Sequence, residues 1–312
     1  MSASIHSASS DQEKYSRMLF TAHDRTVSEG NDLLECLEAA RDPLISMYQG
    51  KEINLPAPNG DLINGVHFQG GQKNAIVFLQ GNGCFYESSS TRPLHWMESL
   101  KDGSGQVPHL IVFNPRGTGK SSGVTETHNV EEDLTLLFNY LVKEQGVDPK
   151  HVVFAGHSMG GYFAVFGALR VQKEYPDSTV HLVLDRSFPD LHSRLASKIE
   201  KYASNKISGL YLARKFHQKI DSWKWAKDSI EAIDQLKGRV CVIFHQKDGI
   251  VLYKDSFHSQ LNSSASKKEY SSIELVEANA DVPIHAKFHN REYTDVENEQ
   301  IVKELKLMLG VS

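Results

Sequence analysis

One serine in the chain has a glycine two residues before it and another two residues after it, and it lies between a strand-like and a helix-like stretch. Residues 156–160 read Gly-His-Ser-Met-Gly, with Ser158 at the centre. The preceding run, 152–155, is apolar and β-branched, as in a buried strand, and a helical pattern begins directly after Ser158. Such a sharp turn exposes a serine as a nucleophile, and glycines are needed because neighbouring side chains would collide across it. The alternative is an ordinary strand–turn–helix in which the serine has no catalytic role.

The helix that follows Ser158 adds an electrostatic reason for this interpretation. It begins directly beneath the serine, so its N-terminal N–H groups can stabilise negative charge at that point. The sequence therefore predicts a site at which a serine attacks a carbonyl group and an anion develops.

The stretches around this turn predict an alternation of strands and helices. A turn signal at 58–61 joins two strands into an antiparallel hairpin. The predicted strands are 52–55, 62–68, 74–80, 109–113, 152–155, 180–185, 240–244 and 272–277, and the predicted helices include 94–100, 130–143, 221–236 and 296–309. This order predicts an α/β protein with a mostly parallel sheet covered by helices on both faces.

The segment before the hairpin is predicted to lie outside the catalytic core. Residues 1–14 are polar and predicted to be disordered, while 28–48 have a helical apolar pattern that Pro43 should end or kink. We therefore expect an N-terminal polar segment and helical extension over 1–50, and one α/β domain over 51–312.

The strand spacing is interrupted once, between the strands ending at 185 and beginning at 240. About fifty residues lie there, more than one crossover helix needs. Residues 190–220 are helical, apolar and basic, with seven Lys or Arg against two acids. We interpret this segment as an inserted helical cap. Its basic face either contacts anionic lipid head groups as a peripheral membrane surface or is a solvated helix face.

Composition excludes several classes of function. The 312 residues carry a net charge of −5, which argues against a nucleic-acid-binding protein. The three cysteines are scattered and give no disulfide framework. The chain shows neither the apolar core of a signal peptide nor a run long enough to cross a bilayer. We expect a soluble, cytoplasmic protein with no obligate protein partner, although signal-independent export stays open.

Four motifs occur in an order that resembles the α/β-hydrolase superfamily over Ile53–Leu309. Leu79-Gln-Gly-Asn82 is similar to the oxyanion loop after the third strand, and residues 114–123 resemble the R-G-x-G-x-S-x-G loop after the fourth. Residues 156–161 match the nucleophile elbow, and Asp248-Gly-Ile-Val251 resembles the D-x-x-V acid loop. The chain is most similar to the α/β-hydrolase-domain (Bem46-like) serine hydrolases. That resemblance implies ester, thioester or lipid hydrolysis without a cofactor.

The resemblance implies a catalytic triad with the chain order serine, acid, histidine. Asp248 is the favoured acid because D-x-x-V matches only there, with Asp185 at another strand end as the alternative. Two histidines follow the last strand, and we expect His285 in preference to His289 as the base, although the usual glycine before the base is absent. The two histidines are also spaced as a zinc half-site, but no H-E-x-x-H motif or cysteine cluster accompanies them, so no metal is expected.

The same resemblance implies an oxyanion hole made by two backbone N–H groups, those of Asn82 and Met159. Gly81 and Gly83 would let the backbone approach the acyl oxygen closely, or else form a plain tight turn. Gln80 stands where histidine is usual in this loop. Arg116 is expected to brace loops around the site.

Other functions are weaker interpretations of the same residues. The sequence Gly117-Thr-Gly-Lys-Ser lacks the first glycine of a phosphate-binding loop, because residue 114 is Asn. A non-catalytic binding protein with this fold, an acyltransferase and a serine peptidase remain alternatives. A small-molecule or lipid acyl substrate is the expected partner.

Overall fold

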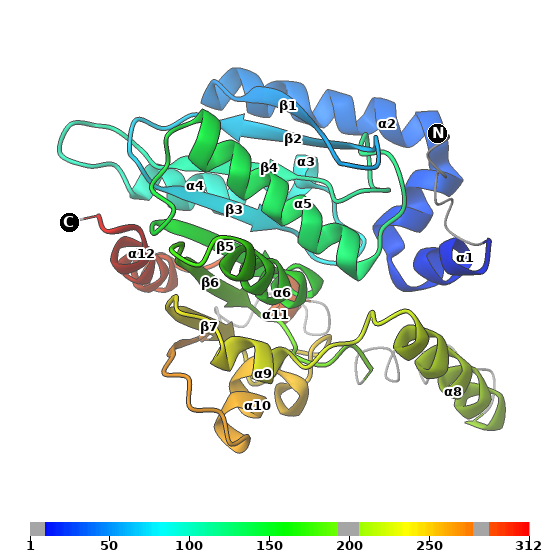
Figure 1. Cartoon of the computed structure of the whole chain (residues 1–312). Coiled ribbons are helices and arrows are strands. Elements are labelled where there is room, and N and C mark those ends of the chain that lie inside the picture. Colours follow the sequence, from blue (N-terminus) through cyan, green and yellow to red (C-terminus); the bar gives the residue numbers. More distant parts are fainter. Residues whose placement is uncertain (1–9, 193–205, 277–286, 312) are drawn as a thin grey trace.

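In the computed structural model, which describes residues 10–192, 206–276 and 287–311, the strands form one sheet (Figure 1). The strands are β1 (Lys51–Pro56), β2 (Leu62–Phe68), β3 (Ala75–Leu79), β4 (His109–Phe113), β5 (Val152–His157), β6 (Val180–Asp185), β7 (Val240–Phe244) and β8 (Ser271–Glu274). The helices are α1 (Ser10–Leu19), α2 (Thr21–Tyr48), α3 (Tyr86–Ser89), α4 (Thr91–Ser99), α5 (Thr127–Asn139), η1 (Tyr140–Glu144), α6 (Met159–Glu174), α8 (Lys206–Ser222), α9 (Ser229–Asp234), η2 (Tyr253–Asp255), α10 (Phe257–Ser263), α11 (Lys287–Asn290) and α12 (Asp295–Leu309).

The sheet has the strand order β1-β2-β4-β3-β5-β6-β7-β8. Strand β2 pairs antiparallel with β1 and with β4, and every later pair from β4 to β8 is parallel. The prediction of a mostly parallel sheet with a leading hairpin is confirmed. Because parallel strands share one direction, the loops that follow β3, β5 and β7 meet at the same edge.

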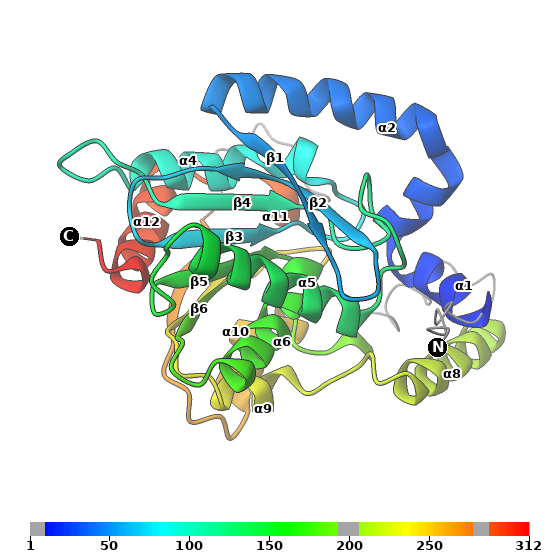
Figure 2. The ribbon, with the colours of Figure 1, turned by 45° about the horizontal axis from the view of Figure 1, so that its top comes forward.

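Helices cover both faces of the sheet (Figure 1, Figure 2). Successive side chains of a strand point to opposite faces of the sheet. Because both faces are covered, β5 is buried along its whole length. Phe154 packs in the core under α5 and α6, whereas Val153 and Ala155 pack in the core beneath α4 and α12. The central strand that leads to Ser158 is therefore held from both sides.

The N-terminal segment is more ordered than the sequence predicts. Residues 10–14, predicted to be disordered, begin α1, which is anchored where the Ser16 hydroxyl donates to the carbonyl of Thr125. Helix α2 continues through Pro43 and instead loses helical geometry at Gly30, where φ is 57°. The prediction of an end or kink at Pro43 was wrong in place, because the break needs the left-handed backbone that glycine adopts readily.

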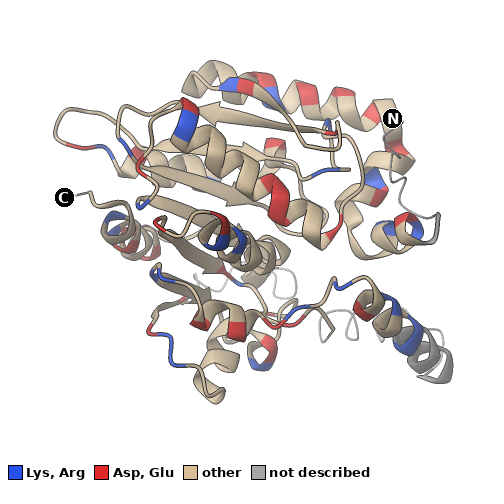
Figure 3. Cartoon of the chain, in the orientation of Figure 1, with Lys and Arg blue, Asp and Glu red and all other residues tan. Residues whose placement is uncertain are grey.

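The segment after β6 also differs from its predicted form. The predicted helix over 221–236 is divided, because α8 ends at Ser222 and Lys224 has a φ of 57°. Helix α9 starts afresh, since the Asp228 carboxylate caps the N–H groups of Ile230 and Glu231. Part of the predicted cap, 193–205, lies outside the described residues. Its described part, α8, projects beside α1 and carries basic residues (Figure 1, Figure 3).

Candidate active site

Ser158 lies on the turn between β5 and α6 in a strained backbone conformation, with φ 53° and ψ −119°. Its N–H donates to the carbonyl of Asp185 at 2.8 Å, and its carbonyl accepts from the hydroxyl of Ser187 at 2.6 Å. Strain of this kind costs about 1–3 kcal/mol and persists only where neighbouring contacts enforce it. The turn therefore has the geometry of a nucleophile elbow.

Two glycines allow the turn to close. A Cβ atom on Gly156 would lie 2.3 Å from the carbonyl carbon of Gly160, and one on Gly160 would lie 2.3 Å from the carbonyl oxygen of Leu79. Real side chains do not tolerate such contacts, so the steric reason inferred from the sequence holds here. Helix α6 begins at Met159, and its N-terminal end lies next to the serine.

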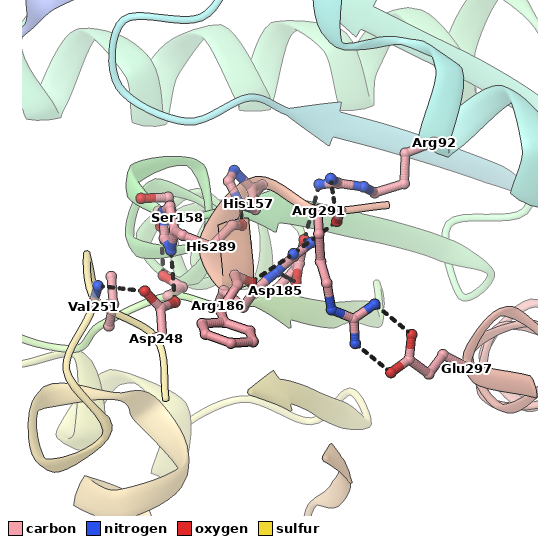
Figure 4. Close-up of polar contacts among 12 residues, drawn as sticks. Arg92, His157, Ser158, Asp185, Arg186, Asp248, Val251, His289, Arg291 and Glu297 are labelled. Atoms are coloured by element: carbon pink, nitrogen blue, oxygen red, sulfur yellow. Dashed lines mark hydrogen bonds and ion pairs between the residues drawn. The ribbon is translucent and has the colours of Figure 1, made fainter. Parts of the chain in front are cut away.

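A buried carboxylate–histidine pair lies beside this turn (Figure 4). Nδ1 of His289 and Oδ2 of Asp248 are 2.7 Å apart. The other carboxylate oxygen, Oδ1, accepts the backbone N–H groups of Ile250 and Val251 at 2.7 and 3.0 Å. An ionised carboxylate only accepts, so Nδ1 of His289 carries the proton and Nε2 has the lone pair that a general base needs.

The two histidine candidates have different outcomes. His285 lies outside the described residues, so its predicted role as base is untested. His289, the less favoured candidate, is the histidine that pairs with Asp248. Within the described residues no hydrogen bond joins His289 to the Ser158 hydroxyl, and such contacts often tighten only when substrate binds. The usual glycine is absent before both histidines, since Ile284 precedes His285 and Phe288 precedes His289, so that signal does not separate the two candidates.

The loop after β3 approaches the elbow closely. A Cβ atom on Gly81 would lie 3.0 Å from Nδ1 of His157 and 3.3 Å from Cβ of Ser158. The loop thus approaches the serine at Gly81, and the role of the Asn82 N–H as an oxyanion donor stays a prediction. Gln80 is buried and donates from Nε2 to Oδ1 of Asn114, which fixes the start of the loop.

Asp185, the alternative acid, is paired with two arginines (Figure 4). Its carboxylate accepts hydrogen bonds from Nε and Nη2 of Arg186 at 2.7 and 2.9 Å, and from Nη1 of Arg92 at 3.1 Å. Burial alone would raise the pKa of Asp185, but the positive charges of Arg186 and Arg92 hold it below its usual value. Asp185 is therefore ionised and committed to these arginines.

This cluster holds the helix that carries His289. Nη1 of Arg186 donates to the carbonyls of Phe288 and Arg291 at 3.2 and 2.9 Å. Nη2 of Arg92 also donates to Arg291, and Nε2 of His157 donates to the carbonyl of His289 itself at 2.9 Å. Burial keeps the pKa of His157 well below its ordinary value, so this ring is neutral. Sequence reasoning missed these supports because they join distant segments.

Arg116 has the bracing contacts that the sequence predicts. Its side chain is buried and donates to Asp133 at 2.6 Å, to Glu132 at 2.7 Å and to the carbonyl of Asn129 at 2.8 Å. These bonds tie the loop after β4 to α5. The Arg116 guanidinium is thus engaged by protein partners at Nε and Nη2.

A cavity of about 220 Å³ opens beside the elbow. Its walls come from the end of β3 and the loop after it, from α3 and α4, from β5 and from the end of α11, and they include Gly81, Cys84, Arg92, His157, Asn290 and Glu292. The cavity thus borders the elbow at His157 and the loop after β3 at Gly81, but Ser158, Asp248 and His289 are not among the residues that line it.

The described residues contain neither a cluster of metal ligands nor a membrane-spanning helix. Over 10–192, 206–276 and 287–311, no three His, Cys, Asp or Glu side chains gather as metal ligands would. In the same ranges, none of the helices has both the length and the apolar character needed to traverse a bilayer.

The strand order, the serine elbow after β5 and the acid loop after β7 define the α/β-hydrolase fold. A solved structure described as an α/β hydrolase (ABH) from Vibrio vulnificus has a TM-score of 0.64 to this chain. The two sequences are 15% identical, and the superposed region includes 98% of this chain and 95% of the Vibrio vulnificus chain. The fold class predicted from the sequence, an α/β-hydrolase fold, is confirmed.

Sequence comparison identifies partial relatives. No protein-family model matches the chain. Over 168 residues, half of this chain, it is 27% identical to a multifunctional-autoprocessing repeats-in-toxin protein of Vibrio vulnificus, of which it spans 3%. Over 167 residues, 51% of this chain, it is 25% identical to the human phosphatidylserine lipase ABHD16A, of which it spans 27%. The chain thus matches only a minor part of either relative.

Proposed function

We propose that this protein is a serine hydrolase that cleaves an ester, thioester or lipid acyl bond through an acyl-enzyme intermediate. In this proposal Ser158 is the nucleophile, His289 is the general base and Asp248 orients the base. The observation that carries it is the 2.7 Å contact of Asp248 with His289, next to a serine held in a strained elbow. His289 replaces His285 because it is the histidine seen to pair with the acid.

The first half-reaction transfers the acyl group to the enzyme. The Ser158 hydroxyl oxygen attacks the acyl carbon while Nε2 of His289 takes its proton. The carbonyl oxygen becomes an anion that the N–H groups of Met159 and Asn82 stabilise. The intermediate then collapses, the bond to the leaving group breaks, and Nε2 returns the proton to that group.

The second half-reaction releases the acid. A water molecule loses a proton to Nε2 of His289 and attacks the acyl-serine carbonyl, forming a second oxyanion. Collapse breaks the bond to Ser158, whose oxygen regains the proton. Asp248 stays ionised throughout and stabilises the imidazolium form of His289.

One of the partial relatives is a phosphatidylserine lipase, which supports a lipid acyl substrate. We propose that basic residues of the cap, including the exposed Arg214 and Lys215 on α8, contact anionic lipid head groups at a membrane surface. Support comes from the position of α8, which projects from the body of the protein (Figure 3).

The proposal is tested by turnover of a panel of soluble esters and thioesters of increasing acyl length. Wild-type protein should hydrolyse at least one of them, and Ser158→Ala should show only background hydrolysis with an unchanged melting temperature. Ser99→Ala is the control for a serine-to-alanine change, because Ser99 is exposed on α4 and lies outside the elbow. Equal turnover by wild type and Ser158→Ala would overturn the proposal.

A further inference from the structure

The side chain of Asn82 is tied to the junction between α1 and α2. Its Oδ1 atom accepts the N–H of Thr21 at 2.7 Å, and its Nδ2 atom donates to the carbonyl of Leu19 at 2.9 Å. The amide group thus binds the main chain on both sides of the single residue, Phe20, that separates the two helices. These bonds span more than sixty positions of sequence.

The junction is anchored in the core. Leu19 and Phe20 are only 2% and 3% exposed. The ring of Phe20 lies 5.8 Å from that of Phe163 on α6 and 5.8 Å from that of Trp225. Helix α6 begins with Met159, the other proposed oxyanion donor. One short junction therefore contacts both structures that are proposed to supply oxyanion N–H groups.

Further contacts fix the two helices to the loop after β4. The Ser16 hydroxyl donates to Thr125, Nδ1 of His23 lies 2.5 Å from the carbonyl of Gly117, and Gly119 donates to the hydroxyl of Thr26. The junction is therefore a fixed part of the protein and can serve as a reference point for the oxyanion loop.

The oxyanion loop needs such a support. Asn82 stands between Gly81 and Gly83, which have no side chains to pack, and Gly83 has a φ of 85°. An N–H donor acts on an oxyanion only when it is held in the correct position before the reaction. Two bonds within reach of the loop help to hold it, from the Cys84 N–H to the Gly81 carbonyl and from Arg25 to the Gly83 carbonyl, and the Asn82 side chain adds the link to the α1–α2 junction.

We propose that the Leu19–Thr21 junction is a positioning element of the active site, which holds the Asn82 N–H toward the reacting acyl oxygen. This inference rests on the proposed serine hydrolase function. It also gives the N-terminal helices a role in catalysis, whereas the sequence placed them outside the catalytic core.

Thr21→Pro tests the proposal. Thr21 is the first residue of α2, where proline is well tolerated, so this change removes the N–H that binds Asn82 and keeps the helix start. Phe20 has an extended backbone, as a residue before proline requires. Thr21→Ala is the matched control because it removes the side chain and keeps the N–H.

We expect kcat for a short soluble ester to fall about tenfold in Thr21→Pro, with KM within about twofold, because the lost support weakens only the transition state. Affinity for a trifluoromethyl ketone, which forms a tetrahedral oxyanion on the serine, should fall in parallel. Thr21→Ala should keep both values near wild type. A purely structural role would lower the melting temperature. In assays at temperatures well below the melting temperature, kcat and analogue affinity would then be unchanged.

Asn82→Asp provides a second test that leaves α2 unchanged. It keeps an acceptor for Thr21 and replaces the donor to Leu19 with a repelling oxygen, so kcat and analogue affinity should also fall. Wild-type values in folded Thr21→Pro or in Asn82→Asp, or equal losses in Thr21→Pro and Thr21→Ala, would overturn the inference. Failure of the wild-type protein to hydrolyse any ester would instead count against the proposed function.

Discussion

Nδ1 of His289 lies 2.7 Å from Oδ2 of Asp248, and the two side chains are only 5% and 2% exposed. Forty-one positions separate them in the sequence, and they come from different elements that follow β7 and β8. The carboxylate fixes the tautomer of the ring, so the basic nitrogen is Nε2. This pairing gives the proposed base its identity.

His289→Ala should reduce kcat/KM for a soluble ester by at least about a thousandfold, since no other group would take the serine proton. His285→Ala is the control and should stay within about threefold of wild type. The measurement is steady-state hydrolysis with melting temperatures recorded in parallel. Full activity in His289→Ala, with loss in His285→Ala, would restore the sequence-based choice.

Asp248→Asn should lower kcat by about a hundredfold to ten-thousandfold with little change in KM. An amide in this position can donate to Nδ1, which favours the tautomer with its proton on Nε2, the wrong atom for a base. Asp255→Asn, on the nearby η2, is a control outside the pair. An Asp248→Asn enzyme with wild-type kcat would show that Asp248 does not orient the base.

Asp185→Asn should destabilise the protein by about 3–5 kcal/mol because it leaves the buried Arg186 without its carboxylate. Glu292→Gln is the matched control: Glu292 lies 3.7 Å from Arg92 but is 68% exposed, so its loss should change stability little. Urea unfolding followed by circular dichroism measures both. Similar free energies of unfolding for the two variants would contradict this account of the cluster.

Acid should destabilise the fold partly through His67. Burial lowers the pKa of His67 to about 4, whereas an unfolded histidine titrates near 6.5. Between these values the unfolded state binds more protons, so this contribution to stability is complete above pH 6.5 and is lost as pH falls toward 4. His67→Gln should therefore lose about 2 kcal/mol less stability than wild type between pH 7 and 5. Urea unfolding at both pH values tests this, with the exposed His95→Gln as control; equal pH dependence in wild type and His67→Gln would refute it.

Neutralising Arg214 and Lys215 together should weaken binding to phosphatidylserine vesicles by about tenfold or more, at about 1 kcal/mol for each basic residue near the surface. Hydrolysis of a soluble ester should be unaffected. Lys101→Gln with Lys303→Gln removes the same charge from exposed positions on other elements. Vesicle cosedimentation measures binding, and equal affinity in the two double variants would exclude a specific membrane role for α8.

The sequence predicts those parts of the site that depend on local sterics. Gly156 and Gly160 flank a serine whose turn cannot close around side chains, so their spacing, together with the strand pattern before it and the helical pattern after it, predicts the elbow. Short continuous apolar runs predict the parallel strands, because a strand that is buried on both faces of a sheet needs apolar side chains at nearly every position.

Features that depend on contacts between distant segments could not be predicted. The choice between His285 and His289 depends on how the chain returns to the sheet after β8, which no local pattern fixes. The bonds of Arg186 to the carbonyls of Phe288 and Arg291 likewise join segments more than a hundred positions apart. The packing of Phe20 against Phe163 on α6, which anchors the junction between α1 and α2, also joins distant parts of the sequence.

The most direct measurement is labelling of the folded protein with a fluorophosphonate, read by intact mass and peptide mapping. The account predicts one adduct per chain, on Ser158, that is lost in Ser158→Ala and after heat denaturation and is formed far more slowly in His289→Ala. A well-folded protein that forms no adduct, or forms it on a different residue, would contradict the assignment of Ser158 as an activated nucleophile.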